Sequence, residues 1–281
     1  MSDPVSTWRM TRRALAAEAA RVVALLRDVT EPPPRPAGQV WGVSELAAHL
    51  SHGWMILPAL ARGDEDPLRE LVGSTSFRHP SELGALTQRA VEADPERDPV
   101  VLADRIETAA SSYLSSCRDS DVDQVQPWLA SGVRVPMPLF SAHLLNETVL
   151  HGLDLARAAG RPWQVDPAHA SLALHEFLVP IIRELPGDVV DVGAARARVV
   201  MEFRLRRAGR LRLRLEDGGL HVDDPAAPGR VDVRIGTDPA TLLMFLWNRQ
   251  SLGRVLMRGR AVVWGRAPWR AVRMKRAVAL P

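Results

Sequence analysis

The sequence LFSAHLLNETVLHGLDLARAAG, which runs from Leu139 to Gly160, predicts the long helix on which the fold depends. Prolines stand just before it at positions 136 and 138, where proline is tolerated, and Gly160 can adopt the left-handed conformation that often ends a helix. Apolar residues fall on nearly all sides of this predicted helix, which is typical of a buried helix. We therefore expect it to lie inside a helical domain.

Four ionisable side chains project from one side of this predicted helix. His143, Glu147 and His151 are spaced four residues apart, and Asp154 follows three residues later. A buried carboxylate beside two imidazoles must be paired or bound to a metal, because an uncompensated buried charge is very costly. In one interpretation Glu147 pairs with an arginine and the histidines bond to the backbone. In the other, Glu147 and His151 bind a metal together with a residue of another helix.

The length and composition favour a globular protein. The chain has 281 residues, of which 46% are hydrophobic, which is enough for one large or two ordinary domains. No apolar run approaches the roughly 20 residues that a membrane-spanning helix needs, and no apolar signal-peptide core follows the N-terminal arginines. Cys117 is the only cysteine, so an internal disulfide is impossible and we expect a cytoplasmic protein. Its polar neighbours do not suggest a nucleophile.

Positive charge is concentrated in the last part of the chain. Residues 196–281 hold 19 basic and 7 acidic side chains, a net charge of +12, whereas the whole chain carries +3. An anionic substrate, a nucleic acid or a membrane surface could bind such a segment. Solvated arginines on exposed strand faces explain most of the charge more simply. The sequence has no helix-turn-helix and no aromatic and basic platform, so we expect no nucleic-acid partner and no membrane partner.

The first 160 residues have the pattern of an all-helical bundle. We expect helices over residues 8–29, 44–61, 80–93 and 99–116, with Ser44 as the N-cap of the second and a proline-rich connection at residues 31–36. On the second helix His49 faces inward, and His52, one turn further on, is the competing candidate. Metal sites in helical bundles are built from side chains on facing helices, which His49, Glu147 and His151 could provide.

The pattern changes after Trp163. Residues 166–185 predict a helix that Pro180 could interrupt. Apolar and charged residues then alternate over 199–206, 211–215 and 231–235, which predicts half-buried strands, and residues 217–219 suggest a hairpin turn. Helices over 239–247 and 251–258, a short strand over 261–264 and a last helix from Pro268 complete the region. We therefore expect an α+β domain with helices on one face of its sheet.

Two segments resemble the signatures of the mycothiol-dependent maleylpyruvate isomerase family. They are WGVSELAAHL at residues 41–50 and ETVLHGLDLA at residues 147–156. The segments GTDP at 236–239, WNR at 247–249, RGR at 258–260 and WGRAPW at 264–269 resemble that family's C-terminal domain. The resemblance implies a DinB-like four-helix bundle over residues 1–163 and a sterol-carrier-like α+β domain over residues 164–281. One departure is the GQV at residues 38–40, where the family often has Cys-Pro-Gly.

The resemblance also implies a metal site. A divalent metal, expected to be zinc, would be held by His49, Glu147 and His151, and His143 and His52 would be neighbours. Asp154 could orient an imidazole or pair with an arginine. Three protein ligands leave an open coordination position, as in catalytic zinc sites. A thiol bound there loses its proton, and the resemblance implies that this thiol is mycothiol.

The family reaction adds the mycothiol thiolate to the cis double bond of maleylpyruvate, permits rotation, and releases fumarylpyruvate. This small anionic substrate needs cations, for which Arg249 and Arg254 are our candidates. We expect an enzyme, either an isomerase or a thiol S-transferase acting on another electrophile. An apolar-ligand or lipid carrier is the alternative, based only on the expected fold of the C-terminal half. A nucleic-acid-binding regulator is a third class, based on the +12 charge.

Overall fold

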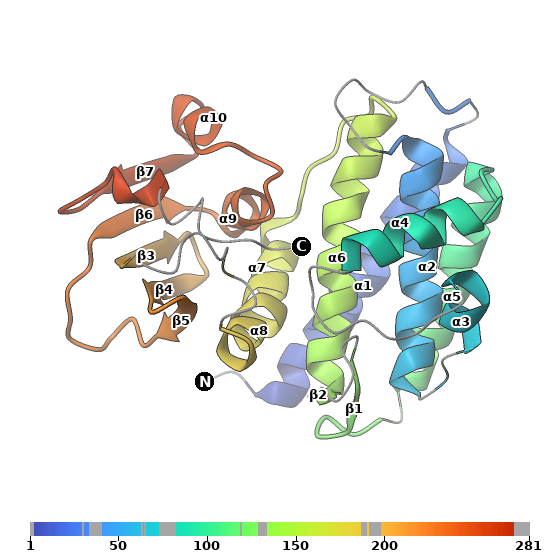
Figure 1. Cartoon of the computed structure of the whole chain (residues 1–281), viewed down its shortest axis with the longest axis horizontal. Helices are drawn as coiled ribbons and strands as arrows, with labels where there is room; N and C mark the ends of the chain where they lie inside the picture. The colour runs from blue at the N-terminus through green and yellow to red at the C-terminus, as the bar shows by residue number, and fades with distance from the viewer. Residues whose placement is uncertain are drawn as a thin grey trace. The chain divides into compact units, whose positions relative to one another are not determined.

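The computed structural model describes residues 3–29, 31–33, 41–62, 64, 66–72, 83–118, 120–128, 134–186, 190 and 198–272. The chain divides into two compact units, Met1–Val165 and Asp166–Pro281 (Figure 1). Within the described residues the first unit is mainly helical and the second contains a five-stranded sheet. The predicted order, an α region followed by an α+β region, is therefore confirmed. In the described part of the chain, no helix is both long and apolar enough to cross a membrane.

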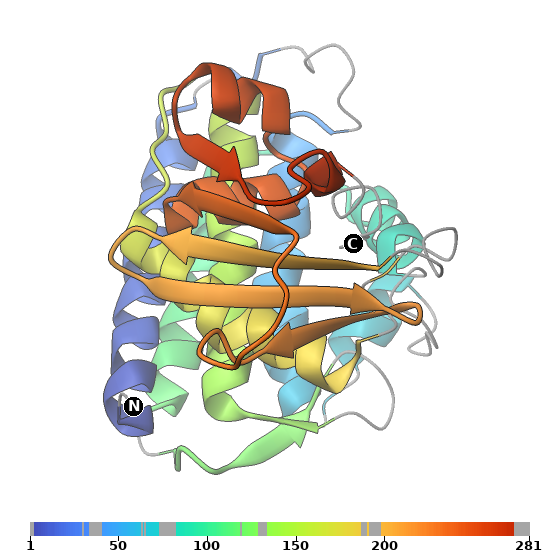
Figure 2. The ribbon, with the colours of Figure 1, turned by 90° about the vertical axis from the view of Figure 1, so that its left-hand side faces the viewer.

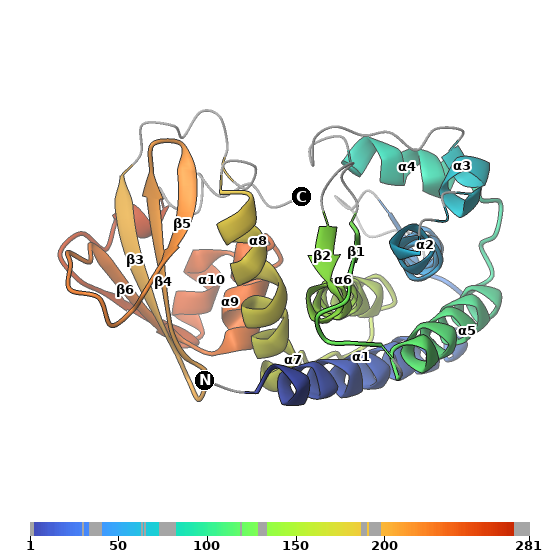
Figure 3. The ribbon, with the colours of Figure 1, turned by 90° about the horizontal axis from the view of Figure 1, so that it is seen from below.

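The first unit is built on its long helices (Figure 3). They are α1 (Pro4–Arg27), α2 (Val43–Ala61), α5 (Pro99–Ser116) and α6 (Met137–Ala158). Helices α1 and α2 each pack against both α5 and α6. The shorter elements are α3 (Asp66–Val72), α4 (Leu83–Ala93) and the antiparallel pair β1 (Val125–Pro127) and β2 (Arg134–Pro136). The sequence did not lead us to expect α3, β1 or β2.

Helix α6 forms where the sequence predicts it, two residues earlier at each end. Pro136 is its N-cap and Pro138 lies in its first turn, while Gly160 follows it with a φ of +63°, in the left-handed region. Its apolar side chains are buried on every side, and Phe140 and Leu150 are each 1% exposed. The helix is therefore part of the core along its length.

The start of α2 corrects one expectation. The helix begins at Val43, and Ser44 is not its N-cap. The Ser44 hydroxyl donates instead to the backbone carbonyl of Arg97 at 2.8 Å, and the backbone N–H of Gly42 donates to the Glu45 carboxylate at 3.0 Å. Glu45 therefore satisfies a backbone donor just ahead of the helix, in the manner of the acidic member of a capping box. Part of the predicted helix 80–93 and of the proline-rich connection lies outside the described residues.

The second unit holds a mixed sheet with strand order β5-β4-β3-β6-β7 (Figure 2). Its strands are β3 (Val199–Leu205), β4 (Gly209–Glu216), β5 (Gly219–Asp223), β6 (Val233–Thr237) and β7 (Ala261–Trp264). Strands β3 and β6 are parallel, and the other neighbours are antiparallel. The helices are α7 (Pro167–Leu172), the π-helix η2 (Ala173–Leu178), α8 (Val179–Glu184), α9 (Pro239–Leu246) and α10 (Leu252–Met257). Figure 3 shows α7, α8 and α9 on one face of the sheet, as the sequence predicts.

The other face of the sheet carries paired charges. Glu202 on β3 is only 3% exposed, and its carboxylate accepts from Arg212 at 3.1 Å and from Arg204 at 3.2 Å. Arg234 on β6 lies 3.6 Å from the same carboxylate. Part of the positive charge of residues 196–281 is therefore paired with Glu202 on this face of the sheet and is not presented to a partner.

The helical segment before the sheet is interrupted close to Pro180. The preceding residues form a single π-helical turn, in which the backbone N–H of Val179 donates to the carbonyl of Leu174. Proline has no N–H, and its ring crowds the carbonyl one turn back, so a widened turn ahead of Pro180 relieves both problems. The predicted last helix from Pro268 begins later, at Arg270, and most of it lies outside the described residues.

Candidate metal centre

Three potential metal ligands meet between α2 and α6. His49 comes from α2, and Glu147 and His151 come from α6. One ligand atom from each lies within 4.8 Å of the others. The two Nε2 atoms of His49 and His151 are 3.0 Å apart, and Nε2 of His151 is 3.3 Å from the Glu147 carboxylate. The structure thus brings together the three residues that the sequence suggested as ligands.

The geometry of this cluster fits a divalent metal. In a tetrahedral zinc site with bonds of about 2.0–2.1 Å, neighbouring ligand atoms are about 3.4 Å apart. Two of the three separations, 3.0 Å and 3.3 Å, are close to that spacing, and all three are within 4.8 Å. Two imidazole nitrogens and one carboxylate oxygen are also the donor set of several catalytic zinc sites. Among the described residues, the buried Nδ1 of His151 has no hydrogen-bond partner, and the Asp154 carboxylate lies 3.6 Å from it.

The electrostatics of the cluster keep Glu147 ionised. Burial raises the pKa of Glu147, but the contact with His151 outweighs it and holds that pKa well below its usual range. For His151, burial lowers the pKa, but the carboxylates of Asp154 and Glu147 outweigh it and raise the pKa to about 9. Asp154 lies 3.6 Å from Nδ1 of His151 and 3.9 Å from Arg157. It therefore has both of the neighbours that the sequence suggested.

His143 lies beside the cluster rather than within it. Its Nε2 is 3.8 Å from the Glu147 carboxylate, and its Nδ1 accepts a hydrogen bond of 3.2 Å from the Trp128 indole. Burial lowers the pKa of His143, which favours its neutral form. An imidazole that accepts from an indole is neutral, so His143 adds no charge next to the ionised Glu147.

His52, the competing ligand, has a different partner. Its Nε2 is 2.8 Å from the carboxylate of Asp94, which also accepts from Arg105 at 2.7 Å. These contacts join α2 to α5 and to the loop before α5. His52 is therefore engaged away from the three-residue cluster.

The surroundings of the cluster include residues that sequence reasoning missed. The Trp41 ring lies 5.2 Å from the His49 ring, and its indole N–H donates to Gln88 at 2.9 Å. The side-chain amide of Asn146 donates to the Glu147 carboxylate at 3.2 Å. Trp41 stands in the first signature segment and could have been singled out. No sequence signal marks Asn146, because its hydrogen bond to Glu147 depends on the orientation of its side chain.

The two arginines suggested for substrate binding lie in the second unit. The Arg249 guanidinium donates to the backbone carbonyl of Trp247 at 2.9 Å, directly after α9. Arg254 is exposed on α10. Neither belongs to the metal-ligand cluster, which is formed by the first unit alone.

Comparisons with known proteins agree with this fold. A family model described as the mycothiol maleylpyruvate isomerase N-terminal domain matches residues 12–156, more than half of the chain. The crystal structure of the mycothiol-dependent maleylpyruvate isomerase is similar, with 15% identity, a TM-score of 0.51, and coverage of 87% of this chain and 88% of that one. A histidine-to-alanine mutant of such an isomerase gives 14% identity, a TM-score of 0.53, and coverage of 87% and 91%. No curated protein sequence matches significantly. The chain belongs to the mycothiol-dependent maleylpyruvate isomerase family.

Proposed function

We propose that this protein is a metal- and mycothiol-dependent enzyme. It would act either as a cis-trans isomerase of a small unsaturated dicarboxylate or as a thiol S-transferase on another small electrophile. The observation that carries the proposal is the meeting of His49, Glu147 and His151, whose ligand atoms lie within 4.8 Å of one another. Family membership supports mycothiol as the thiol, and the solved relatives, at 14–15% identity, support the fold alone.

The residues of the cluster suit this chemistry. A zinc-type ion held by three protein ligands has an open position, where it lowers the pKa of a bound thiol. The ionised Glu147 supplies the negative charge that such an ion needs. Asp154, beside Nδ1 of His151, orients the imidazole so that Nε2 faces the other two ligands. The Trp41 ring restricts the His49 ring from the side.

The second unit would supply cations for an anionic substrate. Arg249 and Arg254 remain our candidates for that role. We also propose that residues 1–163 form a DinB-like bundle and that residues 164–281 form a sterol-carrier-like domain, in a cytoplasmic protein. The packing of α1 and α2 against α5 and α6 supports the first assignment. The sheet with helices on one face supports the second.

Metal analysis tests the ligand assignment. We expect the purified chain to bind about one divalent metal ion, most readily zinc. His49→Ala and His151→Ala should each lose most of the bound metal, measured by mass spectrometry of the desalted protein. His52→Ala and His143→Ala are the matched controls and should retain it, with circular dichroism to check the fold. Retention in the His49 variant together with loss in the His52 variant would refute the assignment.

Thiol binding tests the enzyme against a carrier. Calorimetric titration with mycothiol should give binding to the metal-loaded protein and much weaker binding after chelation. Activity towards an electrophile should require mycothiol. Cys117→Ala should change it little, because Cys117 is buried and burial raises the pKa of its thiol. Equal mycothiol binding with and without metal, or none in either form, would exclude the proposed function. Metal-independent binding of apolar ligands would then favour the carrier.

A further inference from the structure

The two oxygens of the Glu147 carboxylate have different neighbours. Oε2 lies 3.3 Å from Nε2 of His151, a second candidate ligand. Oε1 accepts a hydrogen bond of 3.2 Å from the side-chain amide of Asn146 and lies 3.8 Å from Nε2 of His143. A carboxylate can bind a metal through one oxygen or through both. The neighbours of Oε1 therefore affect how Glu147 would hold an ion.

The amide of Asn146 is buried in an orientation that destabilises the fold. The residue is 0% exposed, and its Oδ1 has no hydrogen-bond partner among the described residues. An ionised carboxylate only accepts hydrogen bonds, so the NH₂ group and not Oδ1 must face Glu147. An unpaired buried carbonyl oxygen lowers stability, and leucine, which has the same branched shape, would fill the space without that loss. Packing alone therefore does not explain an asparagine here.

The neighbouring His143 is held in one tautomer by Trp128. The indole N–H can only donate, and it donates to Nδ1 of His143 at 3.2 Å. Nδ1 therefore carries no proton, and the proton of the neutral ring is on Nε2. This N–H group lies beside Oε1 of Glu147 at 3.8 Å, which is longer than a hydrogen bond. The contact is therefore an electrostatic one between a donor group and an ionised oxygen.

We propose that Asn146 and His143 hold Oε1 of Glu147 away from the bound metal, so that Glu147 binds through Oε2 alone. The two donors stabilise the negative charge on Oε1 and oppose the rotation that would bring both oxygens to the ion. With two imidazoles and a single carboxylate oxygen, the ion keeps the open position that a thiol needs. Asn146 and His143 are positioning residues in this account. The inference rests on the proposed function, because it requires that the cluster binds a metal.

Cobalt(II) in place of zinc tests this proposal, because its visible absorption depends on the number of ligands. A tetrahedral site lacks a centre of symmetry, so four-coordinate Co²⁺ absorbs much more strongly than Co²⁺ with five or six ligands. The full-length chain loaded with Co²⁺ should absorb strongly. In Asn146→Leu the carboxylate is free to bind through both oxygens, so the absorption should fall to about half or less. Mycothiol should also bind about ten-fold more weakly to this variant, measured by calorimetry.

Stability separates positioning from a structural role. Asn146→Leu removes the unpaired oxygen, so urea denaturation of the metal-free protein should show a variant at least as stable as the original chain. The matched control is Thr148→Val on the same helix, where the buried hydroxyl donates to the backbone carbonyl of Leu144 at 2.7 Å. This variant should keep the cobalt absorption. Equal loss of absorption in Thr148→Val would indicate a general loosening of α6 and would overturn the proposal.

His143 gives an independent pair of variants. His143→Gln keeps an N–H group near the place of Nε2 and should retain most of the cobalt absorption, whereas His143→Leu should lose it as Asn146→Leu does. If the original chain binds no metal, or if His49→Ala still binds it, the proposed function fails and this inference fails with it. If the metal binds as proposed and both leucine variants keep the cobalt absorption, only this inference is wrong.

Discussion

At the scale of single residues, spacing predicts which side chains can meet, but it does not predict which of two nearby histidines joins the cluster. The spacing of Glu147 and His151 placed them on one side of one helix, and the structure shows both in the cluster. His49 and His52 are three residues apart, so periodicity alone puts both on the same side of α2. What separates them is Asp94, which is far away in sequence and binds His52. Such a long-range pairing has no local signal.

The buried His52 predicts a dependence of stability on pH. Burial lowers the pKa of His52. Asp94 opposes this only in part, because its carboxylate also accepts a hydrogen bond from Arg105. Below about pH 6.5 the unfolded chain therefore takes up a proton on this histidine that the folded chain does not, and folding stability falls as the pH falls. We expect chemical denaturation to give a lower free energy of unfolding at pH 5.5 than at pH 7.5.

His52→Gln provides the comparison for this prediction. Glutamine can keep a donor towards Asp94 but does not titrate, so the variant should lose less stability than the original chain between pH 7.5 and pH 5.5. Other groups titrate equally in both proteins and cancel in the difference. Asp94 itself, whose pKa is lowered by its hydrogen bonds despite burial, loses its contribution only at more acidic pH. Identical pH profiles for the two proteins would contradict the assignment of a neutral buried His52.

At the scale of helices and strands, long patterns were readable, and the elements that were missed are short. Helix α6 and strands β3 and β4 have many residues with a clear period, and they form as predicted. The three-residue strands β1 and β2 are too short to show any alternation, so they were missed. Helix α3, which begins at Asp66, has only seven residues, too few to show a clear helical period.

Two helical glycines of the first unit should respond oppositely to alanine. Among the described residues, none comes within 4 Å of a Cβ added at Gly53 on α2, so Gly53→Ala should stabilise the unit by about 0.5–1 kcal/mol through helix propensity. At Gly152 on α6, an added Cβ would lie 3.0 Å from the Trp163 ring and 3.2 Å from Val22. Gly152→Ala should therefore cost about 1–3 kcal/mol by overpacking. Urea denaturation measures both, and a gain at both positions would mean that Trp163 moves away freely.

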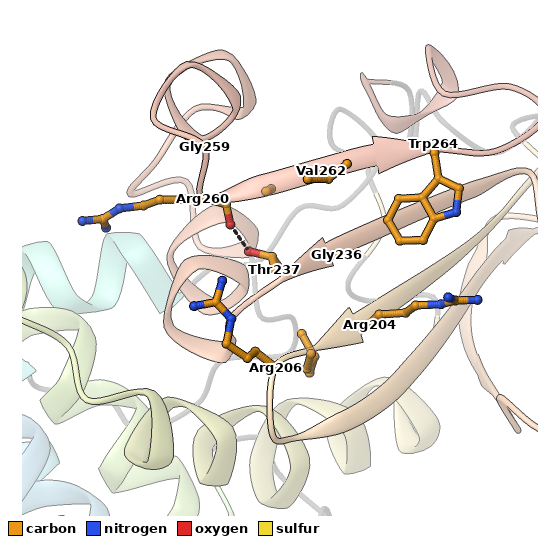
Figure 4. Close-up of a pocket in the computed structure, with 10 residues that line it drawn as sticks. Arg204, Arg206, Gly236, Thr237, Gly259, Arg260, Val262 and Trp264 are labelled. Atoms are coloured by element: carbon orange, nitrogen blue, oxygen red, sulfur yellow. Dashed lines mark hydrogen bonds between the residues drawn. The ribbon is translucent and has the colours of Figure 1, made fainter.

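At the scale of the whole molecule, the change from an α to an α+β region could be predicted, because the spacing of apolar residues changes from the helical period to a period of two residues. The backbone positions of Arg206 and Arg260 on either side of Thr237, three of the residues that line a pocket of the second unit (Figure 4), could not be predicted. Arg206 and Arg260 are distant in sequence, and they belong to a region with 19 basic residues. They come together because β6 pairs in parallel with β3 and antiparallel with β7, so that Thr237 lies between the end of one strand and the start of the other. Strand order decides this, and no local pattern encodes it.

The division into two units predicts where a metal acts on stability. The proposed ligands lie on α2 and α6 of the first unit, so the free energy of metal binding should stabilise that unit. At a free metal concentration of 1,000 times the dissociation constant, the stabilisation is about 4 kcal/mol, which slows amide exchange through global opening about 1,000-fold. Hydrogen exchange read by mass spectrometry should show this slowing in peptides from α2 and α6, and not in peptides from β3 and β6. His49→Ala should abolish the slowing and leave exchange in the sheet unchanged. Slowing that persists in that variant, or equal slowing in the sheet, would mean that the metal binds elsewhere or that the two units unfold as one.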